Sequence, residues 1–142
     1  MTTAELFATV ETLGHLSSLD LASVSKVTGG TFAARESEYF VEQTATDAPG
    51  FSEVWLKLPK PAATFSPVLS LQVADGTCPT WEDAHVRYGF AAKVPPQHSA
   101  PPPALDFWQY PQVAWASLTL AFDPATGCLR RIDLQARAAS AP

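Results

Sequence analysis

Residues 113–137 read VAWASLTLAFDPATGCLRRIDLQAR, which is two runs of alternating apolar residues separated by a turn sequence. An alternation of period two is typical of a β-strand with one buried face. The intervening residues 123–127, DPATG, have the composition of a tight turn. The stretch therefore predicts a β-hairpin made of strands 113–122 and 128–137. Its buried face is expected to carry Leu118, Leu120, Phe122, Ile132 and Leu134.

The same alternation predicts four more strands outside this hairpin. They fall at residues 38–44, 51–58, 68–73 and 105–110, each bounded by turn-forming residues. The proline-rich residues 94–104 are expected to form an extended or irregular loop, because proline cannot donate a backbone hydrogen bond.

Three helices are predicted from apolar spacing and from capping residues. The first covers residues 4–15, with the glycine at position 14 closing it. Two shorter helices begin at the N-caps Asp20 and Thr80, and each ends at a glycine nine residues later. Helices and hairpin-linked strands in one chain of 142 residues predict the α+β class.

The elements occur in the same order in the two halves of the chain. The tripeptide FAA follows the second helix at residues 32–34 and the third at residues 90–92. We therefore expect an internal duplication, with repeats at residues 16–75 and 76–137 and an extra helix at residues 1–15. Each repeat is predicted to be one helix followed by a three-stranded antiparallel meander. Because about 60 residues are marginal alone, we expect one domain with one continuous sheet and all helices on one face.

This pattern resembles the small α/β module of the BamE/SmpA family. The resemblance lies in the capping Thr80 with its later apolar residue and glycine, and in the strand-turn-strand sequence. The latter matches at Leu118, Leu120, Phe122, Asp123, Gly127, Leu129 and Ile132. A tandem pair of such modules is similar to the architecture of the β-lactamase inhibitory proteins and of other bacterial inhibitor and immunity proteins. The resemblance implies one sheet and a protein-binding role.

Strand alternation also predicts which side chains face away from the helices. This outward face carries tryptophan and arginine among polar residues, which is typical of protein interfaces. The alternative is that Trp55 and Trp115 form a second small core under the first helix or the proline-rich loop. The predicted partner-binding residues are Glu53, Trp55, Lys57, Gln72, Trp108, Tyr110, Trp115, Thr119, Arg131 and Asp133.

Charge and motifs narrow the function classes. A net charge of −5 disfavours nucleic acid and anionic membranes as partners, and no apolar run reaches the length of a membrane span. No catalytic motif, metal-ligand spacing or cofactor-binding loop is found. We predict a non-enzymatic inhibitor or immunity protein that neutralises another protein, an enzyme or a toxin. The segment of residues 1–71 carries 8 acidic and 4 basic side chains, and this excess of negative charge favours a basic partner.

Two other functions stay open. His85 follows Glu82 and Asp83 on the third helix, where a carboxylate and an imidazole could act together. The first alternative is therefore a small-ligand carrier or hydrolase with an aromatic pocket near His85. The second is an envelope-assembly scaffold.

The two cysteines bear on the compartment. Cys78 and Cys128 lie fifty residues apart and match no zinc or redox spacing. Two reduced thiols are the first interpretation, and a disulfide, which would favour an oxidising compartment, is the second. The N-terminal residues lack a signal-peptide pattern. The sequence as given therefore predicts a cytoplasmic protein, or a periplasmic one if a signal peptide has been removed.

Overall fold

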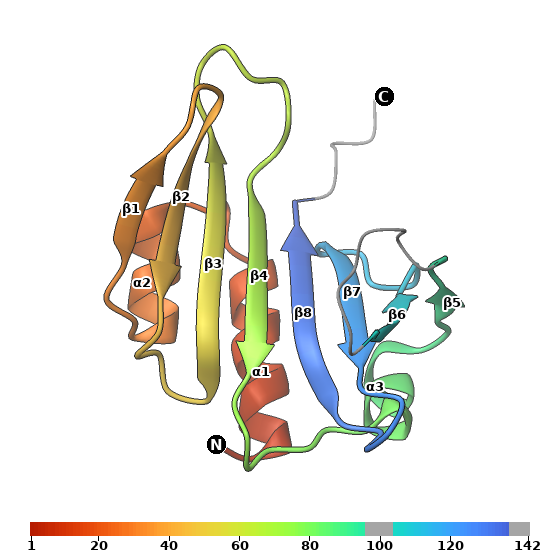
Figure 1. Ribbon diagram of the computed structural model, residues 1–142. Coiled ribbons are helices and arrows are strands. Elements are labelled where there is room, and N and C mark those ends of the chain that lie inside the picture. Colours follow the sequence, from red (N-terminus) through yellow and green to blue (C-terminus); the bar gives the residue numbers. More distant parts are fainter. Residues whose placement is uncertain (96–103, 137–142) are drawn as a thin grey trace.

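Three helices and one eight-stranded antiparallel sheet make up the described residues, 1–95 and 104–136, of the computed structural model (Figure 1). The α+β class is therefore confirmed. The helices are α1 (Thr3–Gly14), α2 (Leu21–Thr28) and α3 (Trp81–Tyr88). The strands are β1 (Ala33–Glu36), β2 (Phe40–Ala45), β3 (Phe51–Pro59), β4 (Val68–Val73), β5 (Ala92–Lys93), β6 (Asp106–Gln109), β7 (Ser117–Phe122) and β8 (Leu129–Gln135). Most of the loop expected at residues 94–104 lies outside the described residues.

The strand order is β1-β2-β3-β4-β8-β7-β6-β5, so two four-stranded meanders meet along β4 and β8. Their antiparallel register places Leu69 opposite Leu134 and Leu71 opposite Ile132, and all four side chains are buried. The prediction of three strands in each half is wrong, because β1 and β5 each add one. Neither has a sequence signal, since β1 is exposed along its whole length and β5 has two residues.

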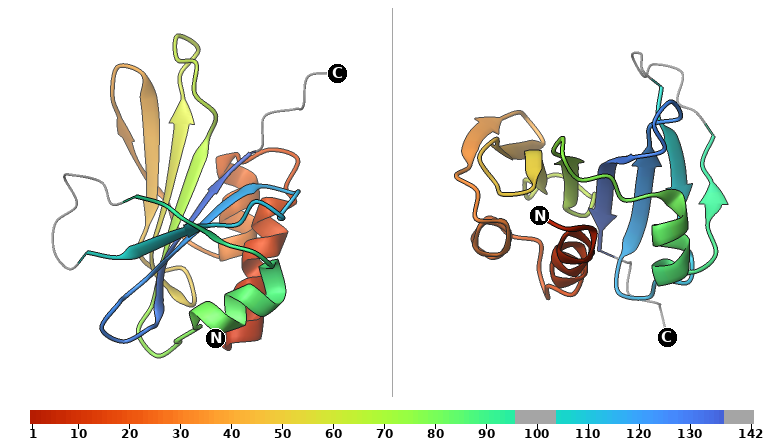
Figure 2. Two further views of the ribbon diagram at one scale, coloured as in Figure 1. Left: turned by 90° about the vertical axis from the view of Figure 1, so that its right-hand side faces the viewer. Right: turned by 90° about the horizontal axis from the view of Figure 1, so that it is seen from below.

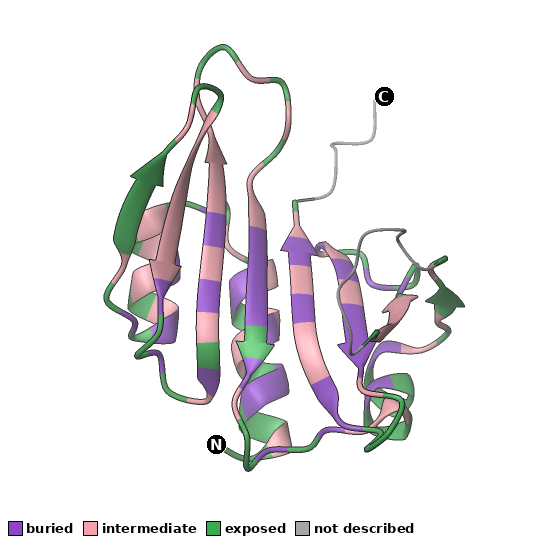
Figure 3. Cartoon of the chain, in the orientation of Figure 1, coloured by how far each residue is buried: buried purple, intermediate pink, exposed green. Residues whose placement is uncertain are grey.

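All three helices lie on one face of the sheet (Figure 2). α1 lies behind the central strands β4 and β8, with α2 behind the first half of the sheet and α3 behind the second (Figure 1). The predicted alternation holds, since buried residues recur along β3 and β8 (Figure 3). α1 inserts four almost fully buried side chains into the core: Leu6, Phe7, Val10 and Leu13.

Gly14 has a packing role rather than the terminating role expected from the sequence. α1 continues through Gly14, and His15 is its C-cap with a φ of −90°. A Cβ atom at Gly14 would overlap the indole ring of Trp115. That ring also stacks on the imidazole of His15, with centroids 5.1 Å apart. Glycine is therefore needed here to let the Trp115 ring lie against the helix backbone.

A disulfide joins Cys78 to Cys128, with their Cα atoms 4.7 Å apart. The interpretation as two reduced thiols is therefore wrong, and the alternative is correct. The bond ties the segment before α3 to the residue before β8, beside a backbone hydrogen bond of 2.8 Å from Leu129 to Pro79. In the chain-entropy account, closing a loop of this length stabilises the fold by about 4 kcal/mol.

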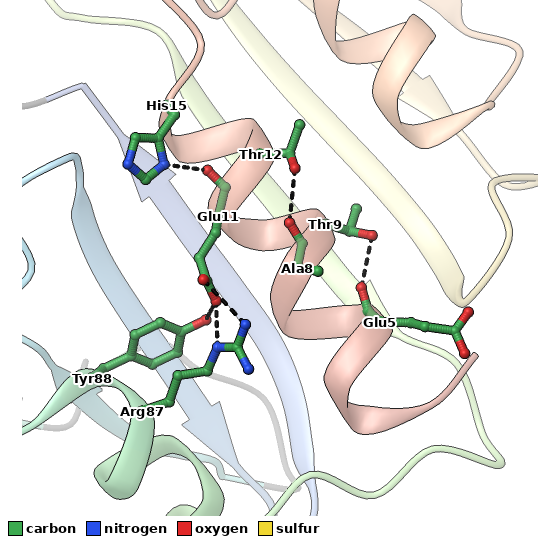
Figure 4. A network of polar contacts seen from close by, with 8 residues as sticks. All are labelled: Glu5, Ala8, Thr9, Glu11, Thr12, His15, Arg87 and Tyr88. Carbon is green, nitrogen blue, oxygen red and sulfur yellow. Dashed lines mark hydrogen bonds and ion pairs between the residues drawn. The ribbon is translucent and has the colours of Figure 1, made fainter.

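A polar network joins α1 to α3 (Figure 4). The Glu11 carboxylate accepts hydrogen bonds from Arg87 Nε at 2.5 Å, Arg87 Nη2 at 3.2 Å and the Tyr88 hydroxyl at 2.9 Å. Burial alone would raise the pKa of Glu11, but the hydrogen bonds from Arg87 and Tyr88 outweigh it and hold that pKa below its usual value. Burial and the bond to Glu11 raise the pKa of Tyr88. The network is therefore built around an ionised Glu11 and a neutral Tyr88.

This network makes the stability of the fold depend on pH in the acidic range. Because the pKa of Glu11 is lower in the folded chain than its usual 4.5, its contribution is complete above that pH. The contribution is lost as the pH falls through the folded-state pKa. We expect Glu11→Gln to lower the free energy of unfolding by about 1–2 kcal/mol at pH 7. The loss should shrink toward pH 3, as measured by urea unfolding.

The matched control is Glu38→Gln, which removes one carboxylate from an exposed turn. It should change the unfolding free energy little at any of these pH values. A loss in Glu11→Gln that stays constant between pH 7 and pH 3 would contradict the assignment.

Candidate functional site

The face of the sheet opposite the helices, here called the open face, is covered by no helix within the described residues (Figure 2). The register aligns one row of its side chains across five neighbouring strands. The row contains Thr44, Trp55, Ser70, Asp133 and Thr119. The long-range pairing of β4 with β8 thus brings residues from both halves of the chain together.

A second row on the open face runs beside the first. Glu53 on β3 is opposite Gln72 on β4, and Gln72 is opposite Arg131 on β8. Between the two rows lies the central hollow, a depression of about 240 Å³ lined by Glu53, Trp55, Ser70, Gln72 and Arg131. Four of these five residues were predicted as partner-binding, and Ser70 was not.

The open face carries seven of the ten predicted partner-binding residues. Besides the four in the central hollow, Lys57, Thr119 and Asp133 belong to this face by their strand positions. Lys57 lies outside the hollow, with its Nζ 4.1 Å from the centroid of the Phe40 ring and 5.2 Å from that of Phe65.

A hydrogen-bonded triad fixes one side of the central hollow. The Ser70 hydroxyl donates to Asp133 Oδ1 at 2.5 Å, and Arg131 Nε donates to the same oxygen at 2.9 Å. Arg131 Nη2 also donates to Ser70 Oγ at 3.4 Å. The side chains of Arg131 and Asp133 remain 42% and 26% exposed, so their ion pair adds little stability. Its main effect is to neutralise Asp133 and to hold the guanidinium beside the hollow.

Glu53 lies on the other side of the same hollow. Within the described part of the chain, no hydrogen bond or ion pair joins its carboxylate to another residue. Among the described residues, the charged groups at the hollow are therefore one neutralised pair, Arg131 with Asp133, and the uncompensated carboxylate of Glu53.

Three of the predicted partner-binding residues lie on the helix side of the sheet, so placing them on the open face was wrong. Trp108 is opposite the buried Leu120 and contacts Trp81, with ring centroids 5.7 Å apart. Tyr110 is 1% exposed and packs against Tyr88.

Trp115 is the third of these residues, and it packs against α1. β7 begins at Ser117 and not at residue 113, so the alternation cannot be extended back to Trp115. The alternative of a small core under the first helix is therefore correct for Trp115. Trp55 lies on the face opposite that helix, and the proline-rich loop of the same alternative lies mostly outside the described residues. The sequence contained one indication that an aromatic ring packs on the first helix, because the glycine at position 14 leaves room for a ring against the helix backbone.

The hydroxyl of Tyr110 is buried and has no hydrogen-bond partner among the described residues. Burial raises the pKa of Tyr110 to about 12. The phenol is therefore neutral at physiological pH, and its role is to fill the core.

A second hollow of about 260 Å³ lies at the end of α1, among mainly apolar residues that include Leu13, Leu16, Leu19 and Trp115. It is smaller than the usual site for a drug-sized ligand, about 300–1,000 Å³. His85 lines neither this hollow nor the central one. Its imidazole stacks on the indole of Trp81 instead, with centroids 4.9 Å apart.

No protein-family model, curated protein or solved structure matches this chain significantly. In residues 1–95 and 104–136, no group of three or more His, Cys, Asp or Glu side chains is arranged to hold a metal ion. None of the described helices is long and apolar enough to cross a membrane. The case for the open face therefore rests on its own residues.

Because Trp115 and Trp55 lie on opposite faces of the sheet, we expect their replacement by alanine to lower the free energy of unfolding by different amounts. Trp115→Ala removes a ring packed on α1 and should lower the free energy of unfolding by about 2–4 kcal/mol. Trp55→Ala removes a partly buried ring that lies on the open face, outside the core cluster, so its cost should be about 1 kcal/mol or less. Urea unfolding of both variants measures the difference. Equal losses, or a larger loss for Trp55→Ala, would contradict the placement of the two rings.

Proposed function

We propose that this chain is a non-enzymatic protein-binding module of the inhibitor or immunity type. It neutralises a partner enzyme or toxin by covering it with the open face. The observation that carries this proposal is the central hollow, in which Trp55 and Arg131 lie among polar side chains on the open face.

The types of residue in the central hollow, and the hydrogen bonds that hold Arg131 in place, favour a protein partner. Tryptophan and arginine are enriched among the residues that dominate binding energy at protein interfaces. Both stand on central strands of one sheet, and Arg131 is held by two hydrogen-bonded neighbours. Side chains that are ordered before binding lose less conformational entropy when the partner arrives. The face therefore has the composition and the rigidity of a binding surface.

The groups in the central hollow favour binding over acyl transfer. Ser70 is hydrogen-bonded to Asp133, but no histidine of the described residues lines the hollow. Activation of a serine requires an adjacent base that removes its proton, and a carboxylate already neutralised by Arg131 is a weak base. This supports a non-enzymatic role for the open face.

We also propose that the two halves are tandem copies of one helix-plus-strands unit. Both α2 and α3 have eight residues, with N-caps at Asp20 and Thr80 and C-caps at Gly29 and Gly89, which both have positive φ. Four strands follow each helix, and their order in the sheet is mirrored about the β4–β8 boundary. The matching caps and strand order support a duplication, with four strands in each copy.

The disulfide bears on where the protein acts. Disulfides form and persist in oxidising compartments and are rare in the cytoplasm. Because Cys78 is bonded to Cys128, we favour the periplasm or another oxidising compartment over the cytoplasmic location expected from the N-terminal residues.

Site-specific photo-crosslinking tests the proposal. A photoreactive phenylalanine analogue is placed at Gln72, which is exposed at the centre of the open face, or at Val86, which is 87% exposed on α3. Both variants are expressed in the cells that produce this protein and are irradiated. We expect one discrete adduct from position 72, competed away by excess unmodified chain, and none from position 86.

The captured protein is then purified, and its own activity is measured with and without an equimolar amount of this chain. Loss of that activity supports an inhibitor or immunity protein. Adducts from position 86 and none from position 72 would overturn the assignment of the open face.

A further inference from the structure

We propose that the central hollow receives one lysine or arginine side chain of the partner protein, seated between the Trp55 indole and the Glu53 carboxylate. This inference rests on the proposed function and names the group that the open face recognises.

The charges at the hollow select a cation. Arg131 is compensated by Asp133, which accepts both its Nε hydrogen and the Ser70 hydroxyl. Glu53 has no partner in the described residues, so the hollow carries one uncompensated negative charge. An incoming ammonium or guanidinium would supply the missing partner and form charge-assisted hydrogen bonds.

An anion fits the same hollow poorly. The Nε and Nη2 atoms of Arg131 already donate to Asp133 and Ser70, so a carboxylate could reach only the remaining hydrogens at the end of the guanidinium. A bound carboxylate would also lie in the same small hollow as the unpaired Glu53. Repulsion between like charges would then oppose binding.

Trp55 supplies the second element of cation recognition. Glu53 and Trp55 are two residues apart on β3, so their side chains leave the same face about 6.6 Å apart. A cation over an indole ring gains electrostatic attraction from the ring, and tryptophan is the strongest of the aromatic residues in this respect. One long side chain can therefore reach the carboxylate while its charged end or its stem lies against the ring.

In residues 1–95 and 104–136, no basic side chain forms an ion pair with Glu53. Lys57 is the next residue along β3 on the open face, and its ammonium lies over the rings of Phe40 and Phe65. The hollow of about 240 Å³ has room for one extended side chain and is smaller than the usual site for a drug-sized ligand. The net charge of −5 would also steer a basic partner toward this protein.

The test uses three peptides that need no knowledge of the partner: acetyl-Gly-Arg-Gly-amide, its citrulline analogue and acetyl-Gly-Glu-Gly-amide. Each is titrated into the intact protein while the indole N–H signal of Trp55, assigned by Trp55→Phe, is followed by NMR. We expect the arginine peptide to shift this signal in a saturable manner that weakens with added salt. The citrulline and glutamate peptides should not saturate it.

Two charge-neutralising variants test whether Glu53 is the carboxylate that binds the arginine peptide. Glu53→Gln should weaken binding of the arginine peptide about 5- to 10-fold, as expected for loss of one charge-assisted contact. The matched control Glu42→Gln removes an open-face carboxylate that lies on β2, outside the hollow, and should leave binding unchanged. An unchanged spectrum apart from the substituted site confirms that each variant is folded.

The inference is overturned if no peptide saturates the Trp55 signal, if citrulline or glutamate binds as well as arginine, or if the two variants behave alike. These outcomes leave the proposed function standing when position 72 still crosslinks to a partner. Failure of the crosslinking with binding of the arginine peptide intact would instead remove the proposed function alone.

Discussion

The antiparallel pairing of β4 with β8 is the contact on which the rest of the structure depends. Apart from α1, each four-stranded meander is accompanied by one α-helix of eight residues, which precedes it in the chain. The pairing joins the two meanders into one sheet and brings their buried leucines and isoleucine onto a common surface. α1 covers that surface at its centre. The disulfide and the Glu11 network then hold α3 and the second half against the same core.

This pairing also creates the open face. The central hollow draws Glu53 and Trp55 from β3, Ser70 and Gln72 from β4, and Arg131 from β8, so neither half could form it alone. With all three helices on the opposite face, this surface keeps aromatic and charged groups accessible. Among the described residues, its centre holds one ion pair and one unpaired carboxylate, so this surface would attract a cation more strongly than an anion.

Local signals made much of this fold predictable. Asp20 and Thr80 cap their helices as expected, and the strand at residues 68–73 matches β4 at both ends. Strand alternation also placed Glu53, Trp55, Gln72 and Arg131 on the outward face. It failed where a strand begins late, at Trp115, or is short, at Trp108, because the face of a side chain then depends on tertiary contacts. The alignment of Ser70 with Asp133 could not be predicted from the sequence either, because it depends on the register of two strands about sixty residues apart.

Native-state hydrogen exchange of the backbone amides tests the central claim most directly, because it reports where the sheet is held together. If the β4–β8 pairing unites the two halves, the amides of Leu69, Leu71, Ile132 and Leu134 should exchange only through global unfolding. They should then be the slowest amides in the sheet, as expected for the most stable part of a cooperative fold. Faster exchange at this boundary than in the β2–β3 and β6–β7 pairs would show that the halves open separately. That result would contradict a single sheet with one shared open face.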